Sequence, residues 1–259
     1  MNDDLKGLWA GRVRVFDELP STNTWMLDHA GEMRHGDVVS ARAQTDGRGR
    51  LDRSWLSLPG RSLAISCALR EPAFIPLGPN LGQFAACAVA DTLAGFGFAA
   101  ALKWPNDVLV ADRKIAGILV EMADTSPVLV LGIGINVNVT EGDFRTAALD
   151  RPATSMQAAT GITLYVEVVQ RALLGKLEQW LDRATTAGMA PLLKRWAAAD
   201  WLAGHAIEVE TASGLVAGQY AGLDELGRLR VARAGGEETL WTGDVVRVKR
   251  FEDTYQPVE

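Results

Sequence analysis

Cysteine and histidine are scarce in this chain of 259 residues, which contains two of the former and three of the latter. Cys67 and Cys87 both stand among apolar residues, so we expect buried, reduced thiols. The histidines pair with no cysteine or carboxylate at the spacing of metal ligands. The sequence therefore predicts neither a disulfide scaffold nor a built-in zinc or iron site.

The sequence also lacks a basic start followed by an apolar stretch, and no apolar run approaches the roughly 18 to 20 residues of a membrane-spanning helix. We therefore expect a cytoplasmic protein that contacts no membrane. Positive charge is in deficit as well, because the formal net charge is -6. This balance argues against a general binder of nucleic acid or anionic lipid, so any contact with a polyanion has to be local.

One segment departs from the acidic balance. Residues 47–55 read Gly-Arg-Gly-Arg-Leu-Asp-Arg-Ser-Trp and concentrate three arginines and two glycines within seven positions. Glycine lets the backbone approach a ligand closely, and the planar guanidinium group matches carboxylate and phosphate. The segment is thus a candidate loop that closes over a small anion. The alternative interpretation is a solvated surface loop without a ligand.

Periodicity predicts an α+β fold, with strands and helices followed by a small β-barrel. We expect the strands before the barrel to form a mixed β-sheet with helices packed mainly on one face. A helical face is expected within 165–186, and an almost entirely apolar strand within 128–139. A hairpin is expected between 55–57 and 62–70. The pattern changes to short alternating segments beyond Gly204, which predicts domains at 1–203 and 204–259.

Several polar positions stand at the ends of these elements. The Ser21-Thr22-Asn23 run is either a simple helix cap or a hydrogen-bonding corner for a polar ligand group. Lys114 leads into an apolar strand, where its amine is partly sheltered. Asn106 and Asp107 follow a proline, and backbone capping alone accounts for them equally well. Further along the chain, Gly132 and Gly134 lie inside a strand and permit a ligand or a neighbouring backbone to come close.

These signals in this order closely resemble the biotin protein ligase family, the biotin–[acetyl-CoA-carboxylase] ligases. The matching segments are Ser21-Thr22-Asn23, Gln44 with Gly47-Arg48-Gly49-Arg50 and Trp55, Lys103-Trp104-Pro105-Asn106-Asp107 with Arg113-Lys114-Ile115-Ala116-Gly117-Ile118-Leu119, and Gly132-Ile133-Gly134-Ile135-Asn136-Val137. The resemblance covers about residues 12 to 250. It implies the catalytic fold shared with class II aminoacyl-tRNA synthetases, followed by an SH3-like barrel. About ten residues precede the first expected strand, so we expect the ligase-only form without a DNA-binding domain.

The resemblance implies an enzyme that joins biotin to ATP and then passes the biotinyl group to a lysine of a biotin carboxyl carrier protein. Arg48, Arg50 and Lys114 match catalytic positions. Positions implied for biotin are Ser21, Thr22, Asn23, Gln44, Gly47, Arg48, Gly49, Arg50, Lys114 and Gly117. Positions implied for ATP are Arg50, Trp55, Asn106, Asp107, Lys114 and Asn136, with Asp107 as a ligand of Mg²⁺ beside the phosphates.

The family loop usually continues with an Arg-Gly pair where this chain has Leu51-Asp52, a departure that bears on loop ordering. Two alternatives stay open at this point. One is a lipoate protein ligase, which shares the fold and the adenylation chemistry. The other is a non-catalytic regulator that binds biotin or nucleic acid; the acidic charge argues against nucleic acid, and the retained Lys114 against a loss of catalysis. The sequence is compatible with a homodimer and with more than one biotin carboxyl carrier protein as the acceptor.

Overall fold

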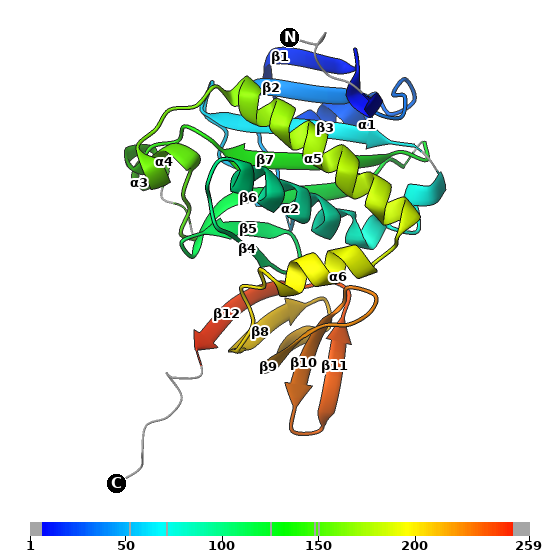
Figure 1. Cartoon of the computed structure of the whole chain (residues 1–259), viewed down its shortest axis with the longest axis vertical. Helices are drawn as coiled ribbons and strands as arrows, with labels where there is room; N and C mark the ends of the chain where they lie inside the picture. The colour runs from blue at the N-terminus through cyan, green and yellow to red at the C-terminus, as the bar shows by residue number, and fades with distance from the viewer. Residues whose placement is uncertain are drawn as a thin grey trace.

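The computed structural model describes residues 7–51, 53–70, 72–124, 126–147, 149 and 151–250. Two β-sheets organise these residues, a larger one towards the N-terminus and a smaller one towards the C-terminus (Figure 1). The larger sheet has the strand order β1-β2-β3-β7-β6-β5-β4. Its strands are β1 (Val13–Leu19), β2 (Val38–Gln44), β3 (Ser62–Leu69), β4 (Ala100–Lys103), β5 (Asp107–Val110), β6 (Arg113–Met122) and β7 (Leu129–Asn136).

The larger sheet is mixed, as predicted. β1 and β2 run parallel, and every other neighbouring pair is antiparallel. All residues of β3 and β7 are buried, and these two strands lie at the centre of the sheet. The two strands pair along their full length, from Ser62 opposite Asn136 to Leu69 opposite Leu129.

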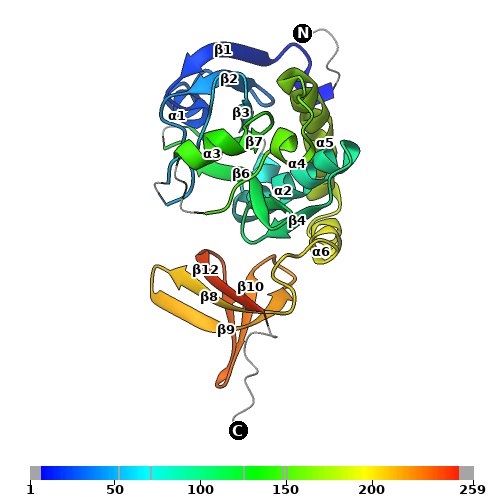
Figure 2. The same cartoon turned by 90° about the vertical axis from the view of Figure 1, so that its left-hand side faces the viewer.

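The two long helices pack on one face of this sheet. α2 (Gly78–Gly95) lies against the strands and α5 (Val166–Thr186) lies against α2, whereas α1 (Thr22–Asp28) covers part of the opposite face (Figure 2). The predicted amphipathic helix within 165–186 is confirmed. The remaining helical segments are η1 (Gly7–Trp9), η2 (Pro72–Phe74), α3 (Glu141–Ala147), α4 (Met156–Thr160) and α6 (Ala190–Ala197).

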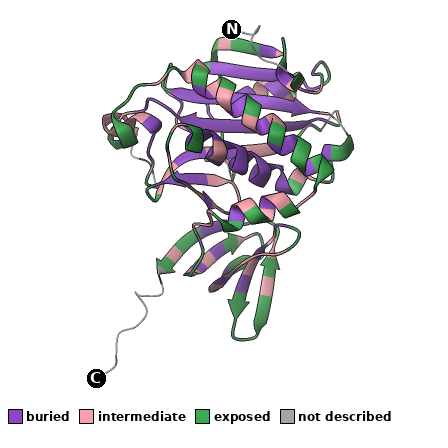
Figure 3. Cartoon of the chain, viewed as in Figure 1, coloured by how far each residue is buried: buried purple, intermediate pink, exposed green. Residues whose placement is uncertain are grey.

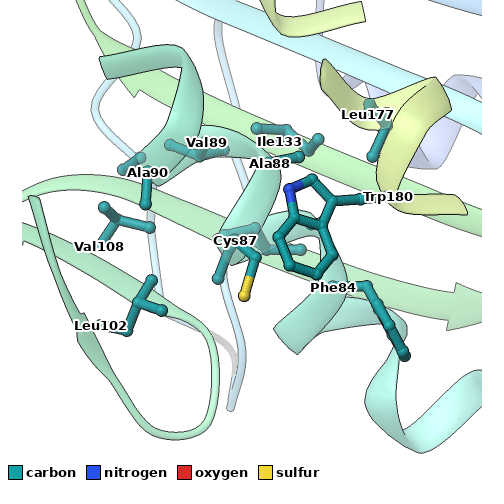
Figure 4. Close-up of a cluster of buried hydrophobic side chains, with 14 of the residues drawn as sticks. Phe84, Cys87, Ala88, Val89, Ala90, Leu102, Val108, Ile133, Leu177 and Trp180 are labelled. Atoms are coloured by element: carbon teal, nitrogen blue, oxygen red, sulfur yellow. The ribbon is translucent and has the colours of Figure 1, made fainter. Parts of the chain in front are cut away.

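The main core lies between the sheet and the two long helices. Burial is nearly continuous along the central strands and α2, whereas the outer side of α5 is exposed (Figure 3). In this core the rings of Phe84 from α2 and Trp180 from α5 lie 6.3 Å apart between centroids (Figure 4). Burying one such aromatic side chain stabilises the fold by roughly 1.5–3 kcal/mol. On the opposite face, a smaller cluster of buried apolar side chains that includes Met26 and Val130 packs between α1 and the sheet.

The smaller sheet is antiparallel and has the order β11-β10-β9-β8-β12, which confirms a small C-terminal β unit. Hydrogen bonds join it to the larger part of the chain, from Gln83 to the carbonyl of Gly227 at 2.8 Å and from Lys103 to that of Val245 at 3.2 Å. The domain boundary near residue 203 stays a prediction. The strands are β8 (His205–Thr211), β9 (Gly214–Leu223), β10 (Leu229–Arg233), β11 (Gly236–Leu240) and β12 (Asp244–Arg250).

The hairpin expected between 55–57 and 62–70 is wrong. Residues 55–57 form no strand, and β3 pairs instead with β2 and β7. The reason lies in Trp55, whose backbone N–H donates to the carbonyl of Gly47 at 2.7 Å. That bond makes residue 55 part of the arginine loop, so it is not available to a sheet ladder.

Candidate active site

A cavity of about 540 Å³ opens on the face of the larger sheet opposite α2 and α5. It collects residues predicted for the site from segments far apart in the sequence. The predicted residues that line it are Ser21, Thr22, Asn23, Gln44, Arg48, Gly49, Arg50, Trp55, Asn106, Asp107, Lys114, Gly117 and Asn136. Gly47 is the one predicted site residue outside this lining.

The cavity floor is made of small residues in register on three neighbouring strands. Gly134 of β7 lies opposite Ala64 of β3 and Gly117 of β6. In the next row on the same face, Gly132 lies opposite Ser66. Because Gly132, Gly134 and Gly117 have no side chains, other groups can rest directly on the backbone there, as predicted for the two glycines of β7.

A polar corner lies at the start of α1. Ser21 is the N-cap, and its hydroxyl accepts from the N–H of Thr24 at 3.4 Å, so the simple capping role is real. Thr22 and Asn23, the next two residues, also form hydrogen bonds with side chains of the sheet. The backbone N–H and the hydroxyl of Thr22 both donate to Oε1 of Gln44, at 2.8 and 3.1 Å. The hydroxyl of Ser66 contacts Oγ1 of Thr22 at 2.8 Å and Oδ1 of Asn23 at 2.6 Å. Buried hydroxyl and amide groups are thus gathered beside the floor.

The arginine segment folds back on itself as a tight loop. Gly49 N–H donates to the carbonyl of Arg53 at 2.7 Å, and Trp55 N–H donates to that of Gly47 at the same distance. Gly47 serves this packing, because a Cβ there would clash with the backbone carbonyl oxygen of Trp55. Leu51 lies at the exposed tip with φ of 55°. Asp52, the other half of the departure from the family pattern, lies outside the described residues.

The cations of the cavity differ in their partners. Arg48 pairs with Glu121 at 2.8 Å, while Arg53 and Arg151 both pair with Asp244 at the start of β12. Arg50 has no carboxylate within 4 Å among the described residues and donates to Oδ1 of Asn106 at 3.4 Å and the carbonyl of Gly243 at 3.3 Å. Burial lowers the pKa of Arg50, although a guanidinium keeps its proton in proteins. Arg50 is therefore the arginine whose charge is available to an anionic ligand.

Lys114 lies close to two other predicted site residues. Its ammonium group is 2.6 Å from Oδ1 of Asp107 and 5.7 Å from the centre of the Trp55 ring. The indole of Trp55 rests on the floor, since a Cβ at Gly134 would meet it at 2.5 Å. Asn106 donates from its side chain to the carbonyl of Ile118 in β6, so this bond ties it to the neighbouring strand, and capping of its own turn stays a prediction.

Two buried polar atoms beside the cavity accept or donate no hydrogen bond within the described part of the chain. They are the indole N–H of Trp55 and Oδ1 of Asn136. Each such group costs about 1–3 kcal/mol when it stays unpaired. Asn136 is held in place because its Nδ2 donates to the carbonyl of Thr154 at 3.1 Å. A polar ligand that forms hydrogen bonds with these two atoms would remove this unfavourable free energy.

Sequence reasoning missed several residues around the cavity. Ser66 carried a weak signal, because its period-2 spacing places it on the same face as Ala64. Glu121, Arg151 and Asp244 carried none, since only the folded chain brings them near the loop. Phe144 and Leu149 also line the cavity. Across the residues that the structure describes, no group of three or more metal-ligating side chains occurs.

The chain was compared with known proteins. Residues 15–138 match the sequence profile of the Biotin/lipoate A/B protein ligase family. A biotin–[acetyl-CoA-carboxylase] ligase of Paracoccus denitrificans is 32% identical over 232 residues, which cover 87% of this chain and 96% of that protein. The bifunctional ligase/repressor BirA of Salmonella typhimurium is 30% identical over 245 residues, which cover 94% of this chain and 76% of that protein.

Solved structures agree with the sequence comparison. A biotin protein ligase from Aquifex aeolicus in complex with biotin and ATP superposes with a TM-score of 0.81 and 25% identity, covering 93% of this chain and 99% of that chain. A biotin acetyl coenzyme A carboxylase synthetase from Helicobacter pylori with bound biotinylated ATP shares the fold, with a TM-score of 0.62 and 24% identity over 88% of this chain and 98% of that chain.

Proposed function

This chain belongs to the biotin protein ligase family, and we propose that its cavity joins biotin to ATP and then passes the biotinyl group to a carrier lysine. The observation that carries the proposal is the convergence of Arg50 and Lys114 on one cavity beside the polar corner at α1. Arg50 has no carboxylate partner among the described residues, and anionic substrates need such a cation. The carrier is proposed to be a biotin carboxyl carrier protein domain of acetyl-CoA carboxylase, by analogy with the Paracoccus relative.

The chemistry divides into two steps. In the first, a carboxylate oxygen of biotin attacks the α-phosphorus of ATP, and pyrophosphate leaves with the electrons of the broken bond. In the second, the amine of the carrier lysine attacks the acyl carbon of this mixed anhydride, AMP leaves, and the amine loses a proton. Two anions must meet in the first step, so fixed positive charge is the main requirement of the site.

The proposed roles follow from this requirement. Arg48, Arg50 and Lys114 would hold the biotin carboxylate and the α-phosphate. Thr22, Asn23 and their hydrogen-bonded neighbours would receive the polar ring of biotin. The full proposed biotin set is Ser21, Thr22, Asn23, Gln44, Gly47, Arg48, Gly49, Arg50, Lys114 and Gly117, where Gly47 acts by shaping the loop. The proposed ATP set is Arg50, Trp55, Asn106, Asp107, Lys114 and Asn136.

A magnesium ion would accompany the ATP phosphates. Mg²⁺ takes oxygen ligands and is commonly bound by one or two carboxylates together with phosphate oxygens and water. Asp107 lines the cavity and supplies one carboxylate, and the unpartnered Oδ1 of Asn136 is a second oxygen of suitable chemistry. These residues fit a metal that arrives with the nucleotide. When bound, the ion would neutralise phosphate charge.

The proposal is tested by incubating the purified protein with ATP, Mg²⁺ and either biotin or lipoate, and analysing the products by mass spectrometry. We expect biotinyl-AMP in the biotin reaction only, and a biotinylated carrier domain when one is added. Lys114→Ala should lose most turnover, at least about 100-fold, because a preorganised charge in the site is removed. Lys194→Ala, an exposed lysine on α6, is the matched control.

Other outcomes decide between the alternatives. Lipoyl-AMP as the main product would favour a lipoate protein ligase. Biotin binding without any adenylate would favour the non-catalytic biotin-binding protein.

None of the helices in the described part of the chain is both long and apolar enough to cross a membrane. A cytoplasmic location stays part of the proposal, and the free, buried thiols of Cys67 and Cys87 are consistent with it.

A further inference from the structure

The carboxylate of Glu121 belongs to none of the sequence motifs, but it contacts two residues that line the cavity. Glu121 is on β6, on the same face as Gly117 and Leu119, and its side chain is 21% exposed. Its Oε2 accepts from Nδ2 of Asn23 at 2.8 Å, and its Oε1 accepts from a terminal nitrogen of Arg48 at 2.8 Å. One carboxylate therefore joins the polar corner at α1 to the first arginine of the loop.

The contact with Glu121 determines how the Asn23 amide is turned. An ionised carboxylate only accepts hydrogen bonds, so it must face the NH₂ group of Asn23. The same NH₂ group lies 3.4 Å from the carbonyl of Leu119, which is also only an acceptor. Turning the amide over would place its oxygen against both acceptors. The oxygen therefore faces the hydroxyl of Ser66 at 2.6 Å, and its remaining lone pair stays available as an acceptor.

The contact also restricts Arg48. A free arginine side chain loses rotamer entropy when a ligand orders it, and this loss opposes binding. Here Glu121 and Thr24 already hold the guanidinium group, the latter at 3.4 Å from its hydroxyl oxygen. Since a guanidinium carries five N–H donors, other donors remain for a ligand. The ion pair contributes little to stability by itself, but it lowers the ordering cost of binding.

We propose that Glu121 is a positioning residue that holds Asn23 and Arg48 at a fixed spacing, so that the ring and the carboxylate of biotin meet preoriented groups. The inference rests on the proposed function, because the roles of Asn23 and Arg48 come from there. Glu121 does not line the cavity, so it acts through these two side chains and not on the substrate itself.

Two variants of Glu121 test its contacts with Asn23 and with Arg48 separately. Glu121→Gln keeps one acceptor oxygen for Asn23 but loses the charge that holds Arg48. We expect biotinyl-AMP to dissociate about tenfold faster from it, while the Kd for biotin alone changes less than about threefold. Glu121→Ala loses both contacts, so the Kd for biotin should also rise about tenfold. The melting temperature of each variant should stay within about 3 °C of the wild type.

Glu208→Gln is the matched control. Glu208 pairs with Arg247 at 3.0 Å in the smaller sheet, and its side chain is 24% exposed, close to that of Glu121. We expect this variant to bind biotin and retain the adenylate as the wild type does. A second control is a double-mutant cycle: in an Arg48→Ala background, Glu121→Gln should not accelerate adenylate release any further.

The measurements are the Kd for biotin by titration calorimetry without ATP, and the release rate of biotinyl-AMP from the purified complex. Wild-type values from both Glu121 variants would overturn the proposal. So would a lowered melting temperature with unchanged binding, or additive effects in the cycle. Failure of the proposed function looks different, since the wild type and Glu208→Gln would then form no adenylate either.

Discussion

Oδ1 of Asp107 lies 2.6 Å from the ammonium nitrogen of Lys114, so the proposed magnesium ligand and a proposed catalytic cation form an ion pair. The pair is partly sheltered, with side chains that are 14% and 30% exposed. When ATP and Mg²⁺ bind, the carboxylate of Asp107 would therefore contact two cations. It would pair with the ammonium group of Lys114 and also give an oxygen ligand to the metal. A substitution at Asp107 should therefore affect both the binding of Mg²⁺ and the ion pair with Lys114.

Asp107→Asn should weaken both contacts. An amide keeps the size of the side chain but loses the charge that attracts Mg²⁺ and Lys114. We expect the Mg²⁺ concentration needed for half-maximal adenylate formation to rise about tenfold, as for the loss of one charge-assisted contact. The measurement is adenylate formation across a Mg²⁺ titration, with Asp182→Asn on the exposed side of α5 as control. An unchanged Mg²⁺ dependence would remove Asp107 from the metal site.

Arg50→Ala should impair retention of the adenylate more than its formation. The guanidinium of Arg50 is half-buried and has no carboxylate partner among the described residues, so its removal takes away one of the proposed counter-charges of the anionic intermediate. We expect biotinyl-AMP to escape into solution about 10 to 100-fold faster, which corresponds to about 1.4–2.8 kcal/mol. The ratio of free adenylate to biotinylated carrier reports this directly. Arg233→Ala, in the smaller sheet, is the control, and equal ratios in the two variants would contradict the role.

Asp244 should make the stability of the protein depend on acid pH. Burial alone would raise the pKa of this carboxyl, but hydrogen bonds from Arg53 and Arg151 hold its pKa well below the usual range. A depressed pKa in the folded state contributes stability above the unfolded value of about 3.9, and this contribution is lost as the pH falls below it. Asp244→Asn should therefore lower the free energy of unfolding by about 1–3 kcal/mol at pH 7.

The same variant should differ less from the wild type at pH 3, where the native carboxylate begins to lose its advantage. Urea denaturation at the two pH values checks this. A difference between Asp244→Asn and the wild type that is equal at pH 7 and pH 3 would show that the carboxylate charge does not provide the stability.

Gly132→Ala should disturb the polar corner. A Cβ at this position would lie 2.8 Å from the amide carbon of Asn23, which must then move off the floor. We expect biotin affinity to fall at least about tenfold, as when a polar group loses its partner. Gly175→Ala on α5 is a matched control, because a Cβ there meets nothing within 4 Å. Alanine in a helix should stabilise the control by about 0.5–1 kcal/mol. Normal biotin binding by Gly132→Ala would contradict the proposed contact.

Local patterns were sufficient for much of the fold. The apolar face of α5 follows from its spacing, because helix geometry imposes a period of 3.6, and the buried strand β7 follows from its almost entirely apolar composition. Residues 55–57 show where this fails. Their pattern is compatible with a strand, but the hydrogen bond between Trp55 and Gly47 and the fit of the indole on Gly134 assign them to the loop instead.

The candidate site, like the fold, could be predicted only in part from local patterns. Local motifs were enough to predict which chemical groups are present: the arginines of the loop, Lys114, the polar corner, and the glycines that allow close approach. How these groups are paired depends on the folding of distant segments against one another. Glu121, Asp244 and Arg151 belong to no motif, and their positions depend on strand register and loop packing. Ion pairs act through space, so which arginine is neutralised and which stays available to a ligand is settled only when distant segments meet.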